Sequence, residues 1–511
     1  MRYSLGRQDF RTLREDGLVY IDKTEHLCRV ADTGQKYFFL SRPRRFGKSL
    51  SVSTYAELYS GDRELFEGLW AYDHWDFAAR HSSVIWLKFA SAAAEPETER
   101  GLHKMIDDNL EKLGIALRTG AGDSVGRRFQ LLIEAAAAAS PSGKTVVLID
   151  EYDKPIVQHL DDIPRAVAQR DALKRFYGVL KDADPYLEFL FITGVSAFSK
   201  VSLFSDLNNV TNLSLHPLAH ALVGLTEAEL EATFSEQLDA TGQSRQTVRE
   251  WYNGYRFAGG AERVYNPWSV MQFLSTRQLR SHWYETATPT WLAELMLDKG
   301  EYDIAGTRLT DQQLLSFDLD RLSPAAILYQ TGYLTIADYD ARRFRYTLDY
   351  PNFEVRSAFD LGLAGALVKG DATAGESRAD ALLDALEEGD LPAVITTLDA
   401  TLADVPHHLW DRGTEAAFHM VAHVMFRAAG AYVTSEVTTA RGRADAIIET
   451  DDRVYCFEFK VGEPAAAALA QIRERGYLDK YADDVRERVA VGVSFDVAGR
   501  KVGAWAEEVL A

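Results

Sequence analysis

Short apolar runs alternate with helical stretches over the first 215 residues. Four runs have the composition of buried strands: 36–40, 83–89, 145–150 and 187–194. Continuous apolar strands separated by helices are typical of a parallel sheet that is covered on both faces. We therefore predict a doubly wound α/β domain over residues 1–215.

The pattern changes to a mainly helical one over residues 216–404. Apolar positions recur with helical spacing at 226–238 and at 378–402. A strand, turn and strand pattern at 332–352 interrupts these helices. Two interpretations stay open for this interruption, a winged-helix-like piece and a plain hairpin packed on helices.

The last segment, 405–511, mixes both periodicities. A helix is predicted at 413–430 and another at about 463–477, and strands are predicted at 431–437, 443–450, 454–460, 489–495 and 502–509. This α-β-β-β-α-β-β order fills about one hundred residues, a usual size for a small domain. The whole chain is thus predicted to be a multidomain α/β protein.

Composition supports a globular chain, because 47% of the 511 residues are hydrophobic and 26% are charged. Cys28 and Cys456 lie far apart in apolar contexts, which favours buried thiols over a disulfide framework. The N-terminus is charged from the start, and no apolar run reaches 18 residues. We therefore predict a cytoplasmic protein without membrane contact.

The formal net charge is −20. Phosphate groups are bound by local lysine and arginine side chains, so this charge disfavours general coating of nucleic acid. Any nucleic-acid contact is expected in a local basic groove.

A phosphate-binding turn is predicted at Gly47-Lys48-Ser49, between an apolar strand and a helix. Backbone N–H groups of such a turn cradle phosphates, the lysine reaches the β- and γ-phosphates, and the hydroxyl binds Mg²⁺. Arg42 occupies the position of the usual first glycine, so the strict G-x-x-x-x-G-K-[ST] pattern fails. An ordinary turn with a surface lysine is the alternative.

Two acidic residues end a later apolar strand at a suitable distance along the chain. Asp150 is placed to orient a metal and Glu151 to polarise water, and Thr193 at the next strand end is placed near the γ-phosphate. A satisfied strand-end hydroxyl is equally compatible with Thr193. The predicted ligands are ATP or another NTP with Mg²⁺, and the nucleotide-binding set is Arg44, Arg45, Phe46, Gly47, Lys48, Ser49, Asp150 and Thr193. The two arginines contact phosphates or cap a neighbouring helix.

A second cluster of ionisable residues lies near the C-terminus. Glu458 and Lys460 are two apart in one strand and share a face, and Asp445 lies in the preceding strand. Two carboxylates suit Mg²⁺ or Mn²⁺, and a nearby ammonium can orient water or offset phosphate charge. An edge-strand salt bridge between Glu458 and Lys460 is the alternative.

Further residues are placed to complete this second cluster. Glu436 and Glu415 are candidates for the metal shell, and Gln471 is a candidate to position water or substrate. His419 and His423 are one helical turn apart but have no acidic or cysteine partner in spacing. We interpret both histidines as stacked core residues.

With these residues in view, the chain resembles AAA-ATPase-like proteins that carry a C-terminal PD-(D/E)xK nuclease-superfamily domain. The resemblance rests on phrases spread over nearly the whole chain, among them YIDKT at 20, FLSRPRRFGKSL at 39, LIDEYDKPI at 148, WYNGYRF at 251, YNPWSV at 265 and FEFKV at 457. Arg42 agrees with this family's own version of the loop.

The resemblance implies nucleotide binding through Lys48, Ser49 and Asp150, and a nuclease-type site at Asp445, Glu458 and Lys460. It also implies a P-loop domain and a restriction-endonuclease-like core. Arg256, within WYNGYRF, is a candidate nucleotide sensor, although the motif itself indicates aromatic packing.

The leading hypothesis is a nucleotide-regulated, divalent-metal-dependent nuclease that acts on DNA, in defence or mobile-element control. The alternative is a nucleotide-switched signalling or nucleic-acid-binding protein without nuclease turnover. An ATPase motor is weaker, since no trans-acting arginine finger or translocation loop is identified. A homo-oligomer is compatible with the sequence, and neither DNA over RNA nor the activating signal follows from it.

Overall fold

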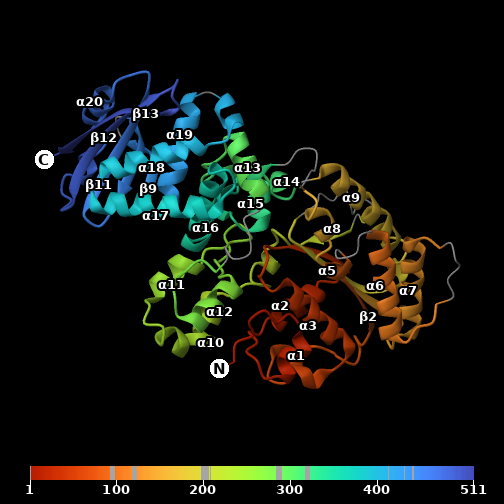
Figure 1. Cartoon of the computed structure of the whole chain (residues 1–511). Coiled ribbons are helices and arrows are strands. Elements are labelled where there is room, and N and C mark those ends of the chain that lie inside the picture. The colour runs from red at the N-terminus through yellow and green to blue at the C-terminus, as the bar shows by residue number, and fades with distance from the viewer. Residues whose placement is uncertain are drawn as a thin grey trace. The chain divides into compact units, whose positions relative to one another are not determined.

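The chain forms two compact units in the computed structural model (Figure 1). Unit 1 comprises Met1–His282 and Ile304–Phe353, and unit 2 comprises Trp283–Asp303 and Glu354–Ala511. The structure describes residues 2–92, 98–117, 123–160, 162–196, 207, 209–282, 290–316, 323–412, 414–430, 432–439 and 442–510. The division expected from the sequence at 1–215, 216–404 and 405–511 stays a prediction, and the middle segment contributes to both units.

A five-stranded parallel sheet organises unit 1. Its strands are β1 (Tyr37–Ser41), β2 (Ser83–Lys88), β3 (Thr145–Asp150), β4 (Leu187–Gly194) and β5 (Thr211–Asn212), in the order β2-β3-β4-β1-β5. All residues of β1 and β3 are buried, as their apolar runs require. Because β4 lies between β1 and β3, its end reaches the same edge as the turn after β1 and the acidic end of β3. The predicted α/β domain is confirmed.

Helices precede, separate and follow the strands of this sheet along the chain. They are α1 (Phe10–Glu15), α2 (Thr24–Ala31), α3 (Lys48–Ser60), α4 (Trp70–His74), α5 (Phe89–Ala92), α6 (Thr98–Leu113), α7 (Val125–Ala139), α8 (Lys154–Val157), α9 (Ile163–Tyr177), α10 (Glu227–Asp239), α11 (Arg245–Tyr252) and α12 (Pro267–Thr276). Thr226 begins α10 with a capping box, since its side chain accepts from the Glu229 N–H and Glu229 binds back.

A small three-stranded sheet completes unit 1. The chain order is β6 (Arg308–Leu309), α14 (Asp311–Leu314), α15 (Pro324–Thr331), β7 (Thr335–Asp340) and β8 (Arg345–Asp349), and the strand order is β6-β8-β7. A third strand that precedes the two helices and pairs with the hairpin favours the winged-helix-like interpretation over the plain hairpin.

Unit 2 contains a helical part and a sheet. Its helices are α13 (Thr290–Lys299), α16 (Phe353–Leu367), α17 (Ala372–Glu388), α18 (Leu391–Asp404), α19 (Thr414–Ala428) and α20 (Ala465–Arg475). The amphipathic pattern at 378–402 is divided between α17 and α18, because Gly389 at φ +78° ends the first and Asp390 caps the second.

The sheet of unit 2 has mixed parallel and antiparallel pairing. Its strands are β9 (Tyr432–Thr439), β10 (Gly442–Glu449), β11 (Arg453–Val461), β12 (Glu487–Asp496) and β13 (Lys501–Leu510), in the order β13-β12-β11-β10-β9. Strands β11 and β12 are parallel, and the other pairs are antiparallel. Buried residues of β10, β11, α20 and β12 form one core, with Ile447, Cys456, Leu469 and Ala490 among them. The α/β core predicted for the C-terminal segment is confirmed.

No helix within the described ranges is long and apolar enough to cross a membrane.

Candidate functional site

The turn after β1 has the geometry of a phosphate-binding loop. Gly47 stands at the N-cap of α3 with φ +96°, a conformation that only glycine adopts without strain. A Cβ added there would meet no atom within 4 Å, so the space beside the turn is open to a ligand. The N–H groups that begin α3 face this turn and carry its positive end.

Lys48 is buried at the first position of α3. Its Nζ donates to the carbonyl oxygens of Arg42 and Pro43, both at 2.8 Å. Burial lowers the pKa of Lys48 to about 8, against the raising effect of Asp150 and the two acidic residues that follow it. The lysine is therefore held at the loop itself, and its role in binding phosphates stays a prediction.

The acidic end of β3 adjoins the end of β4. The Thr193 Oγ1 donates to Asp150 Oδ1 at 2.7 Å, which follows from the position of β4 next to β3. Burial raises the pKa of Asp150, and hydrogen bonds from Thr193 and Ser49 oppose the rise. The structure thus brings Lys48, Ser49, Asp150 and Thr193 together, and this set is suited to a phosphate with a bound cation.

Glu151 follows directly, with φ +55°, and its carboxylate lies 3.0 Å from Lys154 Nζ. A non-glycine residue in the left-handed region is strained, and such strain gathers at functional positions. Asp153, two residues later, accepts from the N–H groups of Val195 and Ser196 and thereby ties the ends of β3 and β4 together.

Arg42, which replaces the usual glycine, is a buried residue that hydrogen-bonds to backbone carbonyls of other segments of unit 1. It is 2% exposed, and its guanidinium donates to the carbonyls of Ser41, Ser214 and Ala219 at 2.7–3.0 Å. The same group lies 4.1 Å from the centre of the Phe257 ring. A side chain that satisfies three buried carbonyls explains why arginine is accepted at this position.

The other loop residues divide between surface and core. Arg44 is exposed, Arg45 lies 4.2 Å above the Trp268 ring, and Phe46 packs edge-on against Tyr255 and Phe257. The aromatic motifs at 251 and 265 therefore pack on the loop, as their composition indicates. Arg256 donates to the carbonyl of Ala337 at 2.9 Å, and its role as a nucleotide sensor stays a prediction.

The second site lies where β10 and β11 meet. Ala446 pairs with Phe457, which places Asp445 and Glu458 opposite each other at the next position. Asp445 Oδ2 accepts from the Phe459 N–H at 2.8 Å. Asp445 and Glu458, the two carboxylates of the predicted cluster, are thus neighbours across the strand pair.

Lys460 and Gln471 join these carboxylates. Lys460 Nζ lies 3.2 Å from Glu458 Oε1 and 2.7 Å from Gln471 Oε1, and Gln471 Nε2 also donates to Glu458 Oε1. The ion pair between Glu458 and Lys460, which was the alternative interpretation, is therefore present. It is part of a ring of hydrogen bonds that also includes Gln471 on α20.

Glu458 is an unusual carboxylate. It is 3% exposed, and its Oε2 has no hydrogen-bond partner among the described residues. Burial, and then the charge of Asp445, raise its pKa to about 7. A buried carboxylate oxygen without a partner is costly, and a divalent cation supplies what it lacks. The residues present thus fit a metal held by Asp445 and Glu458.

The remaining candidates are Glu415, Glu436, His419 and His423. Glu415 on α19 is exposed, and the side chain of Glu436 lies outside the described residues, although its backbone stands opposite Asp445 in β9. His423 is buried against Tyr302, as predicted for a core histidine. His419 is also stacked, edge-on to Phe459, but it is only partly buried, and its Nδ1 lies 3.8 Å from Asp445 Oδ1. Residues on a helix and a distant strand meet here, so sequence spacing gave no sign of the pair.

Comparison with known proteins finds a family match for an N-terminal and for a C-terminal segment of the chain. Residues 4–204 match the model of a predicted AAA-ATPase, and residues 413–505 match that of the PD-(D/E)XK nuclease superfamily. The chain is 37% identical over 520 residues to a protein of Azotobacter chroococcum mcd 1 described as "uncharacterized protein in vnfD 5'region", covering 99% of this chain and 98% of that relative. The chain belongs to this AAA-ATPase-like family with a C-terminal PD-(D/E)XK domain. No solved structure matches it significantly.

For this AAA-ATPase-like protein, the sequence-based predictions missed residues that hold each site in place by hydrogen bonds. Asp153 and Tyr477, which accepts from Gln471 Nε2 at 3.3 Å, were not singled out. Asp153 lies in the matched phrase LIDEYDKPI, so its position beside the acidic pair was a usable signal. Tyr477 had none, because it follows α20 in an unremarkable stretch.

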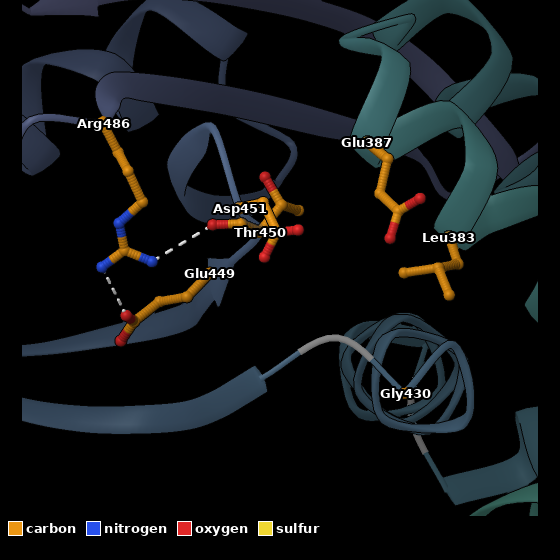
Figure 2. A pocket seen from close by; sticks show the side chains of 7 residues that line it. All are labelled: Leu383, Glu387, Gly430, Glu449, Thr450, Asp451 and Arg486. Atoms are coloured by element: carbon orange, nitrogen blue, oxygen red, sulfur yellow. Dashed lines mark hydrogen bonds and ion pairs between the residues drawn. The ribbon is translucent and has the colours of Figure 1, made fainter.

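A cavity of about 480 Å³ lies at the far end of β10 in the PD-(D/E)XK domain (Figure 2). Arg486, the guanidinium in its lining, lies 2.8 Å from Glu449 and donates to the carbonyl of Thr450. With Glu387 and Asp451 also in the lining, acidic groups dominate the cavity. This charge is unsuited to a phosphodiester.

Proposed function

We propose that this protein is a nucleotide-regulated, divalent-metal-dependent nuclease that cleaves phosphodiester bonds in DNA. The observation that carries the proposal is the buried Glu458 carboxylate, which adjoins Asp445 and Lys460 and leaves one oxygen without a hydrogen-bond partner among the described residues. A purely structural ion pair between Glu458 and Lys460 does not require a second carboxylate beside it.

The roles follow from the contacts. Asp445 and Glu458 would hold the metal, which supplies Lewis-acid stabilisation of charge on the phosphate when bound. Lys460, fixed by Glu458 and Gln471, would orient the attacking water or offset negative charge at the scissile phosphate. Gln471 keeps the ammonium in place and is itself held by Tyr477.

The nucleotide is assigned to the turn at Gly47. Lys48 and the N–H groups of α3 would bind the phosphates, Ser49 and Asp150 would hold Mg²⁺, and Thr193 would fix Asp150. Glu151 is positioned next to this set and would polarise water if the nucleotide is hydrolysed.

The test is a cleavage assay with the purified full-length protein. Single- and double-stranded DNA and RNA are incubated with Mg²⁺ or Mn²⁺, with and without ATP. We expect metal-dependent cleavage of DNA that changes when ATP is added. Binding of nucleic acid without cleavage under every condition would instead favour the nucleotide-switched binding protein.

A further inference from the structure

His419 faces the proposed nuclease centre from α19. Its ring lies edge-on to Phe459, with centroids 5.6 Å apart and planes at 87°, and its Nδ1 lies 3.8 Å from Asp445 Oδ1. The side chains of His419 and Asp445 are 29% and 24% exposed, so both are in contact with solvent.

In each of the two carboxylates, Asp445 and Glu458, one oxygen accepts hydrogen bonds from the protein. Asp445 Oδ2 accepts from the Phe459 N–H, and this leaves Oδ1 on the side of His419. Glu458 Oε1 accepts from both Lys460 and Gln471, whereas Oε2 is buried and has no hydrogen-bond partner in the described part of the chain. Donors of the protein thus orient both carboxylates, and among the described residues no donor binds Glu458 Oε2, while Asp445 Oδ1 has His419 at 3.8 Å.

The distance between His419 Nδ1 and Asp445 Oδ1 bears on whether one metal ion could bind both atoms. At 3.8 Å, Nδ1 and Oδ1 are too far apart for a hydrogen bond. Two ligand atoms that each lie about 2.1 Å from one ion are about 3.0 Å apart at an octahedral angle and about 3.4 Å apart at a tetrahedral one, so Nδ1 and Oδ1 would have to approach by about half an ångström. Within the described residues, no three His, Cys, Asp or Glu side chains are already arranged for a metal, so binding requires a small movement of side chains.

We propose that His419 is a ligand of the metal at this centre, and that the centre therefore selects a borderline ion such as Mn²⁺ over Mg²⁺. An imidazole nitrogen is a good ligand for transition metals and a poor one for Mg²⁺, which takes oxygen ligands. This inference rests on the proposed function and specifies its cofactor class.

The test measures metal binding to the full-length protein without nucleotide or nucleic acid. Calorimetry gives the affinities for Mn²⁺ and Mg²⁺, and pulsed electron paramagnetic resonance of bound Mn²⁺ detects a directly bound nitrogen. The variants are His419→Ala, His419→Gln and Glu458→Gln. His408→Ala is the matched control, because His408 Nε2 lies 3.0 Å from Asp298 in another histidine–aspartate pair of unit 2.

We expect Mn²⁺ bound to the wild type to give a nitrogen signal that Glu458→Gln abolishes together with binding. His419→Ala should remove the signal and weaken Mn²⁺ binding by about tenfold or more, with a much smaller effect on Mg²⁺. His419→Gln should restore part of the affinity through its amide oxygen but not the nitrogen signal. His408→Ala should behave as the wild type.

The outcomes separate this inference from the proposed function. A wild-type complex without a nitrogen signal, or a signal that survives in both His419 variants, overturns the role of His419. If Glu458→Gln still loses the metal, the nuclease centre itself stands. A wild type that binds neither ion overturns both. Should His419→Ala fail to fold in metal-free buffer, the signal of His419→Gln decides.

Discussion

Buried charges next to groups of opposite sign mark both candidate sites. Lys48 lies in the field of Asp150, and Glu458 lies beside Lys460. Burial favours the neutral form of both side chains. It lowers the pKa of Lys48 to about 8 and raises the pKa of Glu458 to about 7. Keeping such groups out of water costs folding free energy. The proposed ligands, a phosphate at the first site and a cation at the second, are of opposite charge and would offset that cost.

Lys48 provides the first prediction at this scale. Lys48→Ala removes the point charge that would face the phosphates, so ATP binding should weaken by at least about tenfold, or about 1.4 kcal/mol. Calorimetry measures the affinity, with Lys174→Ala, an exposed lysine on α9, as the control. Unchanged affinity in a folded Lys48→Ala protein would remove the phosphate site from the loop.

His423 provides a prediction about pH. Burial, and then the charges of Arg427 and Arg356, lower its pKa from 6.5 to about 3. The unfolded chain binds a proton near pH 6.5 and the folded chain does not, so stability present above pH 6.5 is lost as the pH falls toward 3. At pH 5 the loss is about 2 kcal/mol.

Hydrogen exchange in α19 at increasing denaturant measures this stability at pH 7 and pH 5. His423→Phe, which keeps a ring against Tyr302, should lose less stability between the two values. Equal losses in the wild type and the variant would show that His423 is not the group responsible.

At the scale of elements, the phosphate loop of unit 1 depends on segments far along the chain. Phe46 packs on Tyr255 and Phe257, and Arg42 binds the carbonyls of Ser214 and Ala219. The turn that carries these aromatic residues depends in turn on Gly254, at φ +124°, where an added Cβ would overlap the carbonyl oxygen of Pro351.

Gly254→Ala should therefore destabilise unit 1 by more than the cost of a positive φ alone. Gly260 is the matched control, because it has φ +74° but open space around an added Cβ. Gly260→Ala should cost about 1 kcal/mol. Gly254→Ala should cost several times as much and weaken nucleotide binding, as read from thermal melting and calorimetry. Equal costs would mean that the approach to Pro351 is unimportant.

The strands and the local motifs could be predicted from sequence because each depends on neighbouring residues. The runs at 145–150 and 187–194 became β3 and β4 with the predicted bounds. The pairing of His419 with Asp445 could not be predicted, because it depends on how α19 lies against β10. The two-residue strand β5 was missed for a similar reason, since only its pairing with β1 defines it. The sequence interpretation of 378–402 overlooked Gly389, which divides the segment into α17 and α18.

At the scale of the whole molecule, the chain combines a net charge of −20 with a proposed substrate that is also an anion. Long-range attraction to DNA is therefore not expected, and contact must rely on local lysine and arginine side chains. Nucleic-acid binding should thus persist when Asp445 and Glu458 are neutralised, because their proposed action is on the scissile phosphate and not on the rest of the backbone.

Cleavage by carboxylate variants of the full-length protein is the most direct test of the central claim. Wild type, Asp445→Asn, Glu458→Gln and the exposed α20 control Glu474→Gln are compared on DNA with Mg²⁺ or Mn²⁺. We predict that the first two variants lose at least about 100-fold in cleavage rate while the control retains it, since an amide supplies neither the charge nor the ligand strength of a carboxylate. A Glu458→Gln protein that cleaves as fast as the wild type would contradict the account.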